Sequence, residues 1–294
     1  MKVSVGVCAY NEEKNIGRIL TSLINQKTNK IKIDEIFVVS SGCTDKTNDI
    51  VKEFEKKDKR IKLIDQKIRE GKSSAINLFI KGAKNDILVL ESGDTVPNED
   101  AIERLCLPFF NKEVGMTGAR PIPVNKSDDF MGFLVNFFWD LHHEIAMKNP
   151  KCGELVAFRN FVKEIPKESA VDEASIEAIV KENNYKLEYV QEAIVRNKGP
   201  ETVRDFLIQR RRINAGHIWL ERVQKHKVST DKLSIVIWLV VKKLSLNLKR
   251  NFWIIGAMFI EAYGKVLGKY DFYIKNKNPY IWNVAKSTKE LKNA

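Results

Sequence analysis

The sequence predicts an α/β fold, in which a mostly parallel sheet is flanked by helices and followed by a basic helical extension. In the first 97 residues, short runs rich in β-branched residues alternate with segments whose apolar residues recur every three or four positions. Strands that alternate with helices are typical of βαβ units, and therefore of a parallel sheet. Residues 86–90 (DILVL) are almost continuously apolar, which is typical of a strand buried on both faces.

The elements before Pro97 follow one another in a regular order. Strands are predicted at residues 2–8, 33–39, 61–65 and 86–90, and helices at 16–24, 46–56 and 71–81. Polar loops at residues 9–13, 40–45 and 91–97 each follow a strand. Because ligands of parallel sheets bind outside the carboxyl ends of the strands, these loops are predicted to line a site.

The pattern is less regular after Pro97. Helices are expected at residues 130–147, 171–184 and 201–222, and extended segments at 155–159 and 187–190. No element is predicted between residues 98 and 129.

Charge is distributed unevenly along the 294 residues. The net charge is +12, and residues 204–294 alone hold 19 Lys or Arg against 6 Asp or Glu. Such a basic segment is typical of contact with nucleic acid or with an anionic membrane. Four cysteines, Cys8, Cys43, Cys106 and Cys152, have neither CxxC nor zinc-site spacing, which predicts free thiols in a reducing compartment. The first residues continue directly into a strand pattern, so no signal peptide is expected.

Two apolar runs in the basic segment favour a membrane over nucleic acid. Residues 235–241 and 252–260 hold aromatic and aliphatic side chains with Lys and Arg between them, and neither run has the roughly 20 residues that cross a bilayer. This composition predicts helices that lie in the headgroup region, at the cytoplasmic side of the cell membrane, as a peripheral or monotopic anchor. The alternative is an ordinary pair of amphipathic helices packed on the main domain. No motif that reads nucleic acid accompanies the charge.

Three polar features have residue types that suit a metal ion, a general base and a diphosphate. Asp94 follows the fourth strand and is suited to a hard cation, although a single Asp in a loop is usually a turn residue. Glu173 begins a helix and is suited to a general base, although acidic residues there often only stabilise the helix dipole. Residues 209–212 (QRRR) lie on a helix and are suited to a diphosphate, although a solvated basic face has the same composition.

Taken together, these motifs resemble glycosyltransferase family 2, the inverting transferases with a GT-A fold. The similar segments, in the family's order, are residues 5–13 (VGVCAYNEE), 38–47 (VVSSGCTDKT), 69–77 (REGKSSAIN), 90–97 (LESGDTVP), 171–189 and 209–213 (QRRRI). The fourth stands where the family has DADxxP, the fifth where it has the base, and the last where it has QxxRW. The resemblance covers about residues 3–222, and it implies a GT-A domain at 1–222 and an extension at 223–294.

The resemblance also implies roles for individual residues. Those implied to hold the donor, a UDP- or GDP-sugar, are Ala9, Tyr10, Glu12, Ser41, Lys72, Ser92, Gln209 and Arg212. Asp94 is implied to bind Mg²⁺ or Mn²⁺. Glu173 is implied to be the catalytic base, with Asp172 as its rival, because the family's usual Glu-Asp order is inverted here. The chain also differs from the family at Ser92-Gly93-Asp94, which replaces DxD, and at Ile213, which replaces the aromatic residue of QxxRW.

The implied function is transfer of a sugar, with inversion, to a hydroxyl of a lipid-linked or glycan acceptor in cell-envelope glycan synthesis. Two alternatives remain open: a catalytically silent nucleotide-binding scaffold at a membrane, and a sugar nucleotidyltransferase. Of the remaining polar residues, one of His142 and His143 is a candidate for the acceptor site. His217 is a candidate for the metal or a phosphate, and Cys43 is interpreted as a packing residue.

Overall fold

An eight-stranded sheet forms the centre of the computed structural model, which describes residues 1–228, 233–281 and 286–288. Parts of the predicted extension, at residues 229–232, 282–285 and 289–294, lie outside the described residues. The strand order is β3-β2-β1-β4-β7-β6-β8-β5. The strands are β1 (Lys2–Ala9), β2 (Lys32–Ser41), β3 (Ile61–Gln66), β4 (Ile87–Ser92), β5 (Thr95–Pro97), β6 (Val114–Pro123), β7 (Val156–Arg159) and β8 (Lys186–Asn197).

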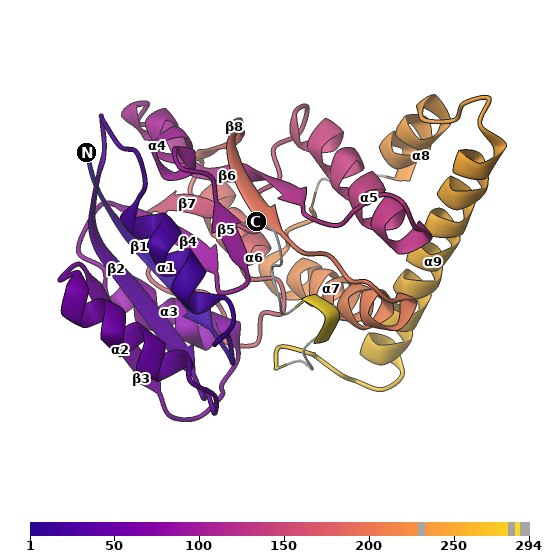
Figure 1. Ribbon diagram of the computed structural model, residues 1–294. Coiled ribbons are helices and arrows are strands. Elements are labelled where there is room, and N and C mark those ends of the chain that lie inside the picture. The colour runs from indigo at the N-terminus through magenta and orange to yellow at the C-terminus, as the bar shows by residue number, and fades with distance from the viewer. Residues whose placement is uncertain (229–232, 282–285, 289–294) are drawn as a thin grey trace.

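The N-terminal half of the sheet is parallel, as predicted (Figure 1). β1 pairs in parallel with β2 and with β4, and β2 pairs with β3. The register aligns Ala9 with Ser40 and Cys8 with Ser92, so three strands reach their carboxyl ends at one edge of the sheet. The loops that were predicted to line a site therefore begin side by side.

Helices cover both faces of this half of the sheet. Successive side chains of a strand point to opposite faces, and the first four side chains of β4 are apolar, so each face is buried by helices. On one face, Val3, Val5 and Val7 pack with apolar side chains of α1 (Ile16–Ile24), α2 (Thr47–Lys57) and α4 (Ala101–Cys106). On the other face, Leu88 and Leu90 pack with α3 (Lys72–Gly82) and α6 (Asp172–Glu182). The prediction of an α/β fold with a mostly parallel sheet is confirmed.

The segment for which no element was predicted, residues 98–129, contains α4, the 3₁₀ turn η1 (Leu107–Phe110) and β6. The short strand β5 lies in the loop that was predicted at residues 91–97. The sequence of β6, VGMTGARPIP, has two Gly and two Pro, which disfavour strands when read alone. Close neighbours require the two glycines: a Cβ at Gly118 would lie 2.7 Å from the Cα of Cys152, and one at Gly115 would lie 2.4 Å from the Cβ of Tyr185. β6 is held between β7 and β8, so tertiary pairing outweighs local propensity. β8 is also longer than the predicted segment 187–190.

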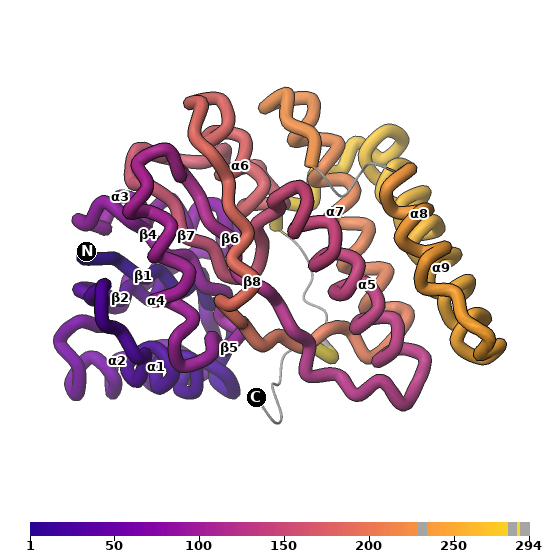
Figure 2. Tube along the Cα trace, turned by 90° about the horizontal axis from the view of Figure 1, so that it is seen from above, coloured from indigo at the N-terminus to yellow at the C-terminus, as the bar shows by residue number. Residues whose placement is uncertain are grey.

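The C-terminal helices form a second body of packed helices beside the sheet. They are α5 (Phe130–Ala146), α7 (Val203–Gln224), α8 (Leu233–Lys242) and α9 (Leu248–Tyr273), followed by the short turn η3 (Lys286–Thr288). Figure 2 shows α5 and α7 between the sheet and the outer pair α8 and α9. An apolar cluster joins α5, α7, α8 and α9, and it includes Leu134, Phe206, Leu239 and Ile254.

The contact between α7 and α9 is close and charged. A Cβ at Gly268 would lie 2.7 Å from the Cβ of Asn214, so the two backbones approach as closely as glycine allows. The guanidinium of Arg211 donates two hydrogen bonds of 2.7 Å to Asp271. The boundary proposed between residues 222 and 223 stays a prediction, and it falls within α7.

None of the helices in the described part of the chain is both long enough and apolar enough to cross a membrane.

Candidate active site

A cavity of about 530 Å³ opens where the three strand-end loops meet α6 and α7. Every site residue predicted from the sequence lines it: Ala9, Tyr10, Glu12, Ser41, Lys72, Ser92, Asp94, Asp172, Glu173, Gln209 and Arg212. These residues come from six segments that are separated in the chain. The structure therefore brings the predicted residues together, while their roles remain proposals.

The wall formed by the first two loops is rigidly built. The backbone N–H of Glu12 donates to Thr47 Oγ1 at 2.8 Å, and the Glu12 carboxylate accepts a hydrogen bond of 2.9 Å from Asn15. Ser41 donates to Gln66 at 2.7 Å. These buried hydrogen bonds fix the depth and the polar lining of this part of the cavity.

An aromatic surface lies at the rim of the same wall. The guanidinium of Arg69 stacks over the ring of Tyr10, 3.9 Å from its centroid. The flat pair suits contact with another planar group, because rings and guanidinium groups stack readily.

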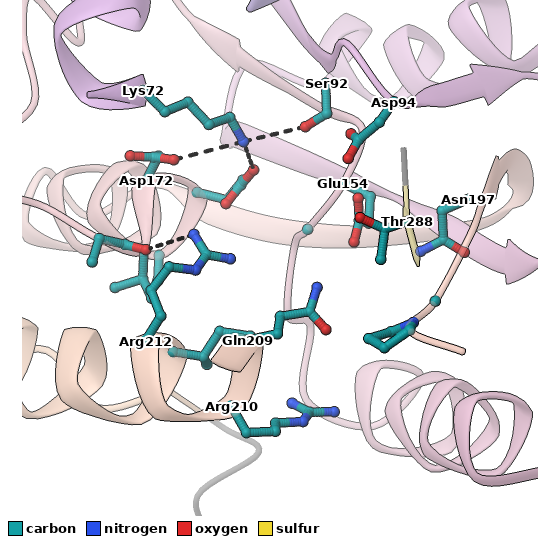
Figure 3. A pocket seen from close by; sticks show the side chains of 18 of the residues that line it. Lys72, Ser92, Asp94, Glu154, Asp172, Asn197, Gln209, Arg210, Arg212 and Thr288 are labelled. Carbon is teal, nitrogen blue, oxygen red and sulfur yellow. Dashed lines mark hydrogen bonds and ion pairs between the residues drawn. The ribbon is translucent and has the colours of Figure 1, made fainter. Parts of the chain in front are cut away.

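Lys72 is the first residue of α3, and its ammonium group joins two of the predicted motifs (Figure 3). Its Nζ lies 2.8 Å from Glu173 Oε1, 3.2 Å from Ser92 Oγ and 3.6 Å from Asp172 Oδ2. Gly71 before it has φ +95° and lies against the backbone of Tyr280, where a side chain would collide. The turn that aims Lys72 into the cavity thus requires glycine.

The two neighbouring carboxylates at the start of α6 differ in environment. Asp172 has a side chain only 2% exposed, and it accepts a hydrogen bond of 2.6 Å from Ser73, whereas Glu173 is 19% exposed. Burial raises the pKa of Asp172 more than Lys72 lowers it. For Glu173 the burial effect is outweighed by the charge and the hydrogen bond of Lys72, and its pKa is lowered. Glu173 is therefore the ionised and more accessible member of the pair.

Glu154 is a cavity residue that was not predicted from the sequence. It precedes β7 in the left-handed region, with φ +62°, which is uncommon for a residue other than glycine. Burial first, and then the charges of Asp94 and Glu173, raise the pKa of Glu154 to about 7. Figure 3 shows Glu154 beside Asp94 and Asn197. A carboxylate placed against another in a cavity is a signal that only the tertiary structure gives.

Asp94 is suited to a divalent cation, although it has few protein partners. Across the described residues, no group of three or more His, Cys, Asp or Glu side chains is arranged to hold a metal. Mg²⁺ is commonly bound by one or two carboxylates, with water and substrate phosphates as its other ligands. Asp94 and the facing Glu154 fit that pattern, and a cation between them would relieve the repulsion that raises the pKa of Glu154.

Gln209 and Arg212 reach the cavity from α7, on the side opposite Lys72 (Figure 3). Arg212 Nη1 donates to the carbonyl oxygen of Ala170 at 3.3 Å. Burial lowers the pKa of Arg212, and the carboxylates of Asp172 and Glu173 act against that effect. A buried guanidinium opposite an ammonium group makes this part of the cavity suitable for an anion.

Of the four other candidate residues, His142 and His217 line the cavity, and His143 and Cys43 do not. His142 lines the cavity, whereas Nδ1 of His143 lies 3.0 Å from the Tyr189 hydroxyl. His217 also lines the cavity, where burial first, and then Lys151, Arg210 and Lys265, lower its pKa. Cys43 packs between the first two loops, where its sulfur accepts from the N–H of Asn11 at 3.2 Å.

A family model identifies the N-terminal half of the chain. The model of Glycosyl transferase family 2 matches residues 4–161, more than half of the sequence. The chain belongs to glycosyl transferase family 2. The match ends before Asp172 and Gln209, so the base block and the QxxRW-like block of this family 2 member stay predictions.

Curated relatives of this family 2 chain share its N-terminal region. It is 36% identical over 115 residues to the probable glycosyltransferase YdaM of Bacillus subtilis, covering 38% of this chain and 27% of that protein. It is 29% identical over 132 residues to the poly-beta-1,6-N-acetyl-D-glucosamine synthase of Staphylococcus epidermidis, covering 42% of this chain and 30% of the synthase. The chain thus matches less than a third of the length of these relatives.

Solved structures extend the likeness to the whole fold. The mannosyltransferase PcManGT from Pyrobaculum calidifontis, in complex with GDP-Man and Mn²⁺, superposes with a TM-score of 0.63 at 19% identity and covers 95% of this chain and 81% of its own. Glucosyl-3-phosphoglycerate synthase from Mycobacterium tuberculosis, with Mn²⁺ and UDP, has a TM-score of 0.54 at 15% identity, covering 75% of this chain and 79% of its own. The GT-A fold implied by the sequence resemblance is confirmed.

Proposed function

We propose that the protein is an inverting glycosyltransferase that moves a sugar from a UDP- or GDP-sugar to a hydroxyl of a lipid-linked or glycan acceptor. The observation that carries the proposal is the cavity in which the ends of three parallel strands meet the Lys72–Glu173 pair and Arg212. Family 2 membership supports the reaction class, and solved relatives of the same fold hold GDP-Man or UDP with Mn²⁺.

The donor is proposed to lie along the first two loops. Its base and ribose contact Ala9, Tyr10, Glu12 and Ser41, and the stacked pair of Tyr10 and Arg69 supplies a planar surface. The diphosphate then lies between Lys72 and Ser92 on one side and Arg212 on the other, where two cationic side chains face each other. Gln209 closes over it from α7.

Glu173 is proposed to act as the general base in a single displacement. The acceptor oxygen attacks the anomeric carbon, the bond from that carbon to the diphosphate oxygen breaks, and the acceptor proton passes to Glu173. Attack opposite to the leaving group inverts the anomeric configuration. Glu173 suits the role better than Asp172 because it is more accessible and is ionised, whereas Asp172 is held by Ser73.

Asp94 is proposed to hold Mg²⁺ or Mn²⁺, with Glu154 facing it. The metal would neutralise charge on the departing diphosphate. The protein's own contribution is the positive charge of Lys72 and Arg212, which face the cavity from opposite sides and are held in place before the donor binds.

The protein is further proposed to work on the cytoplasmic side of a membrane surface, held through α9. One exposed stripe of α9 carries apolar side chains at intervals of three or four residues: Leu248, Phe252, Ile255, Phe259, Tyr263, Val266, Tyr270 and Tyr273. Phe252 is 74% exposed and Phe259 is 72% exposed, while the opposite face of α9 packs on α5 and α7. An apolar stripe beside basic residues is typical of a helix that lies in the headgroup region. The alternative of a packed helix pair accounts for the buried face of α9 and leaves this stripe unexplained.

The test combines nucleotide binding with product analysis. The full-length protein is screened by thermal shift against UDP, GDP and their sugars, with Mn²⁺ or with EDTA, because a ligand that binds only the folded state raises the melting temperature. We expect one nucleotide with Mn²⁺ to raise it and EDTA to remove both the shift and the turnover. Turnover that is unchanged in EDTA would remove Asp94 from its proposed role.

Product analysis separates the alternatives. A transferase releases nucleoside diphosphate, and a sugar nucleotidyltransferase releases pyrophosphate. Ser92-Gly93 in place of a second carboxylate is the feature that favours a silent scaffold. Tight nucleotide binding without turnover on any acceptor would support the scaffold instead.

A further inference from the structure

The cavity continues past the polar site into a cleft between helices. Its walls there are apolar and include Phe138, Trp139 and Leu141 on α5, Phe206 on α7, Val236 on α8 and Met258 on α9. We call this part the helical cleft. A polar sugar nucleotide would not cover these walls favourably. Apolar surface in contact with water is unfavourable, so an apolar group is the better match for this part of the cavity.

Three cations lie at the polar end of the helical cleft. Lys151, Arg210 and Lys265 line the cavity, and all three act on the buried imidazole of His217. They come from three separate segments, the loop before β7, α7 and α9, so the fold gathers positive charge at one place. Figure 3 shows Arg210 on the α7 side of the cavity, away from Lys72, Ser92 and Asp94. This group is therefore distinct from the charges proposed to hold the donor diphosphate.

The positive charge of this group exceeds its negative charge. Arg210 Nε lies 3.0 Å from Glu261 Oε2, and this pairing leaves the other guanidinium N–H groups available. Within the part of the chain that the structure describes, no carboxylate forms an ion pair with Lys151 or Lys265. The buried Nδ1 of His142 likewise has no hydrogen-bond partner among the described residues. Half-buried cations and an unsatisfied imidazole nitrogen are stabilised by an anionic ligand that accepts hydrogen bonds.

The helical cleft also borders the exposed apolar stripe of α9. Ala262 lines the cavity and follows Ile255 by seven residues and Phe259 by three, so it lies on the same stripe of the helix. An apolar chain can therefore pass from the outer face of α9 into the cleft without leaving apolar surroundings.

We propose that the helical cleft is an acceptor subsite for an amphiphile whose apolar isoprenoid or acyl chain ends in a phosphate or diphosphate. The chain lies against the walls of the cleft, and Lys151, Arg210 and Lys265 hold the phosphate. The inference rests on the proposed transferase function. In a lipid-linked acceptor the sugar is attached to that phosphate, and binding in the helical cleft would direct a hydroxyl of this sugar towards Glu173.

Binding to the full-length protein, measured by calorimetry without any donor, tests the subsite independently of turnover. The probes are farnesyl phosphate, the shorter geranyl phosphate, the uncharged farnesol, and inorganic phosphate. We expect farnesyl phosphate to bind more tightly than each of the other three. Farnesol and inorganic phosphate each lack one of its two parts, and geranyl phosphate has a shorter chain that covers less of the apolar walls. Inorganic phosphate that binds as tightly as farnesyl phosphate would identify a site for free phosphate and overturn the proposal.

The charged part is tested by the double substitution Lys151→Gln/Lys265→Gln. It should weaken farnesyl phosphate binding at least about 10-fold, because charge-assisted contacts are lost. Binding of farnesol and of UDP or GDP should be unchanged, which also reports that the variant is folded. The matched control is Lys269→Gln, an exposed lysine one turn further along α9 that does not line the cavity.

The apolar part is tested by Ala262→Trp, which narrows the cleft at its border with the exposed stripe. It should weaken farnesyl phosphate and farnesol alike, whereas Val266→Trp, at an exposed position on the same stripe, should weaken neither. Unchanged farnesyl phosphate binding in both the lysine variant and Ala262→Trp overturns the inference, and so does loss of nucleotide binding in the lysine variant.

These results separate the inference from the proposed function. Normal nucleotide turnover combined with failure of the farnesyl phosphate experiments overturns the subsite alone. Farnesyl phosphate binding as expected in a protein that turns over no nucleotide-sugar supports the subsite and overturns the proposed function alone.

Discussion

Glu173 and Asp172 are adjacent in sequence but have different surroundings, and this difference decides the first prediction. Glu173→Gln should lower kcat by about 10²–10⁴-fold, because a positioned general base contributes that much, while donor binding survives. Asp172→Asn should have a smaller effect on kcat and a larger effect on stability, since Asp172 is buried and accepts a hydrogen bond from Ser73. Steady-state kinetics and nucleotide titration check both variants. An active Glu173→Gln with an inactive Asp172→Asn would move the base to residue 172.

Glu91 is a fully buried carboxyl group that links stability to pH. Burial raises its pKa to about 8, the charges of Glu154 and Asp94 act in the same direction, and Thr95 and Lys72 act against them. In the unfolded chain it titrates near the ordinary value of about 4.3. Between these values the folded protein retains a proton that the unfolded chain has lost, so the free energy of unfolding should fall as pH rises from about 4.5 to about 8.

Glu91→Gln should make that decline shallower, because glutamine does not titrate. The decline should not vanish, since the pKa of Glu154 is raised in the same way. Urea denaturation at three pH values in this range measures the slope. Glu53→Gln, on the exposed face of α2, is the control and should leave the slope unchanged. An identical slope in native and Glu91→Gln proteins would contradict the prediction.

At the scale of elements, two glycines of α9, Gly264 and Gly268, lie directly against α7. Gly268→Ala should reduce the free energy of unfolding by about 1–3 kcal/mol, because its Cβ would lie 2.7 Å from Asn214 and 3.0 Å from the carbonyl oxygen of Arg211. Gly17→Ala in α1 is the matched control, since its Cβ would meet side-chain atoms only at 3.7 Å. That change should be neutral or stabilising by up to about 1 kcal/mol. Chemical denaturation measures the free energy of unfolding of both variants. An equal change at both positions would contradict the explanation that Gly268 is needed for the close packing of α7 and α9.

The exposed stripe of α9 makes a prediction about membranes. Phe252→Glu/Phe259→Glu should abolish co-sedimentation with vesicles that contain anionic lipid, and the loss should not require unfolding because both side chains are already exposed. The control, Thr21→Glu/Asn25→Glu, adds the same charge at exposed positions on and just after α1. Retained vesicle binding in the α9 variant would refute the proposed membrane face. Truncation is a poorer test, because Tyr280 and Thr288 line the cavity.

At the scale of the whole molecule, the proposed donor and acceptor sites lie against different parts of the fold. The parallel strands and their loops provide the polar wall, and α5, α7, α8 and α9 provide the apolar walls of the helical cleft. The excess positive charge of the last third is divided between the cavity, where Arg212 and Lys265 lie, and the outer surface near α9. The basic segment is therefore proposed to act both in the cavity and at a membrane, two roles that the charge count alone does not separate.

The sequence by itself determined the local structure up to the end of β4, because each strand and helix there has a regular apolar pattern and each polar loop follows a strand end. The short strand β5 was not predicted. The order of the motifs was also sufficient to predict the family. β6 was missed because its Gly and Pro residues oppose strand formation and only the partners β7 and β8 hold it. The placement of Glu154 against Asp94, the pairing of Lys72 with Glu173, and the gathering of Lys151, Arg210 and Lys265 were decided by the tertiary structure alone. These contacts join segments that are distant in the chain, and their charges interact only after folding has removed the water between them.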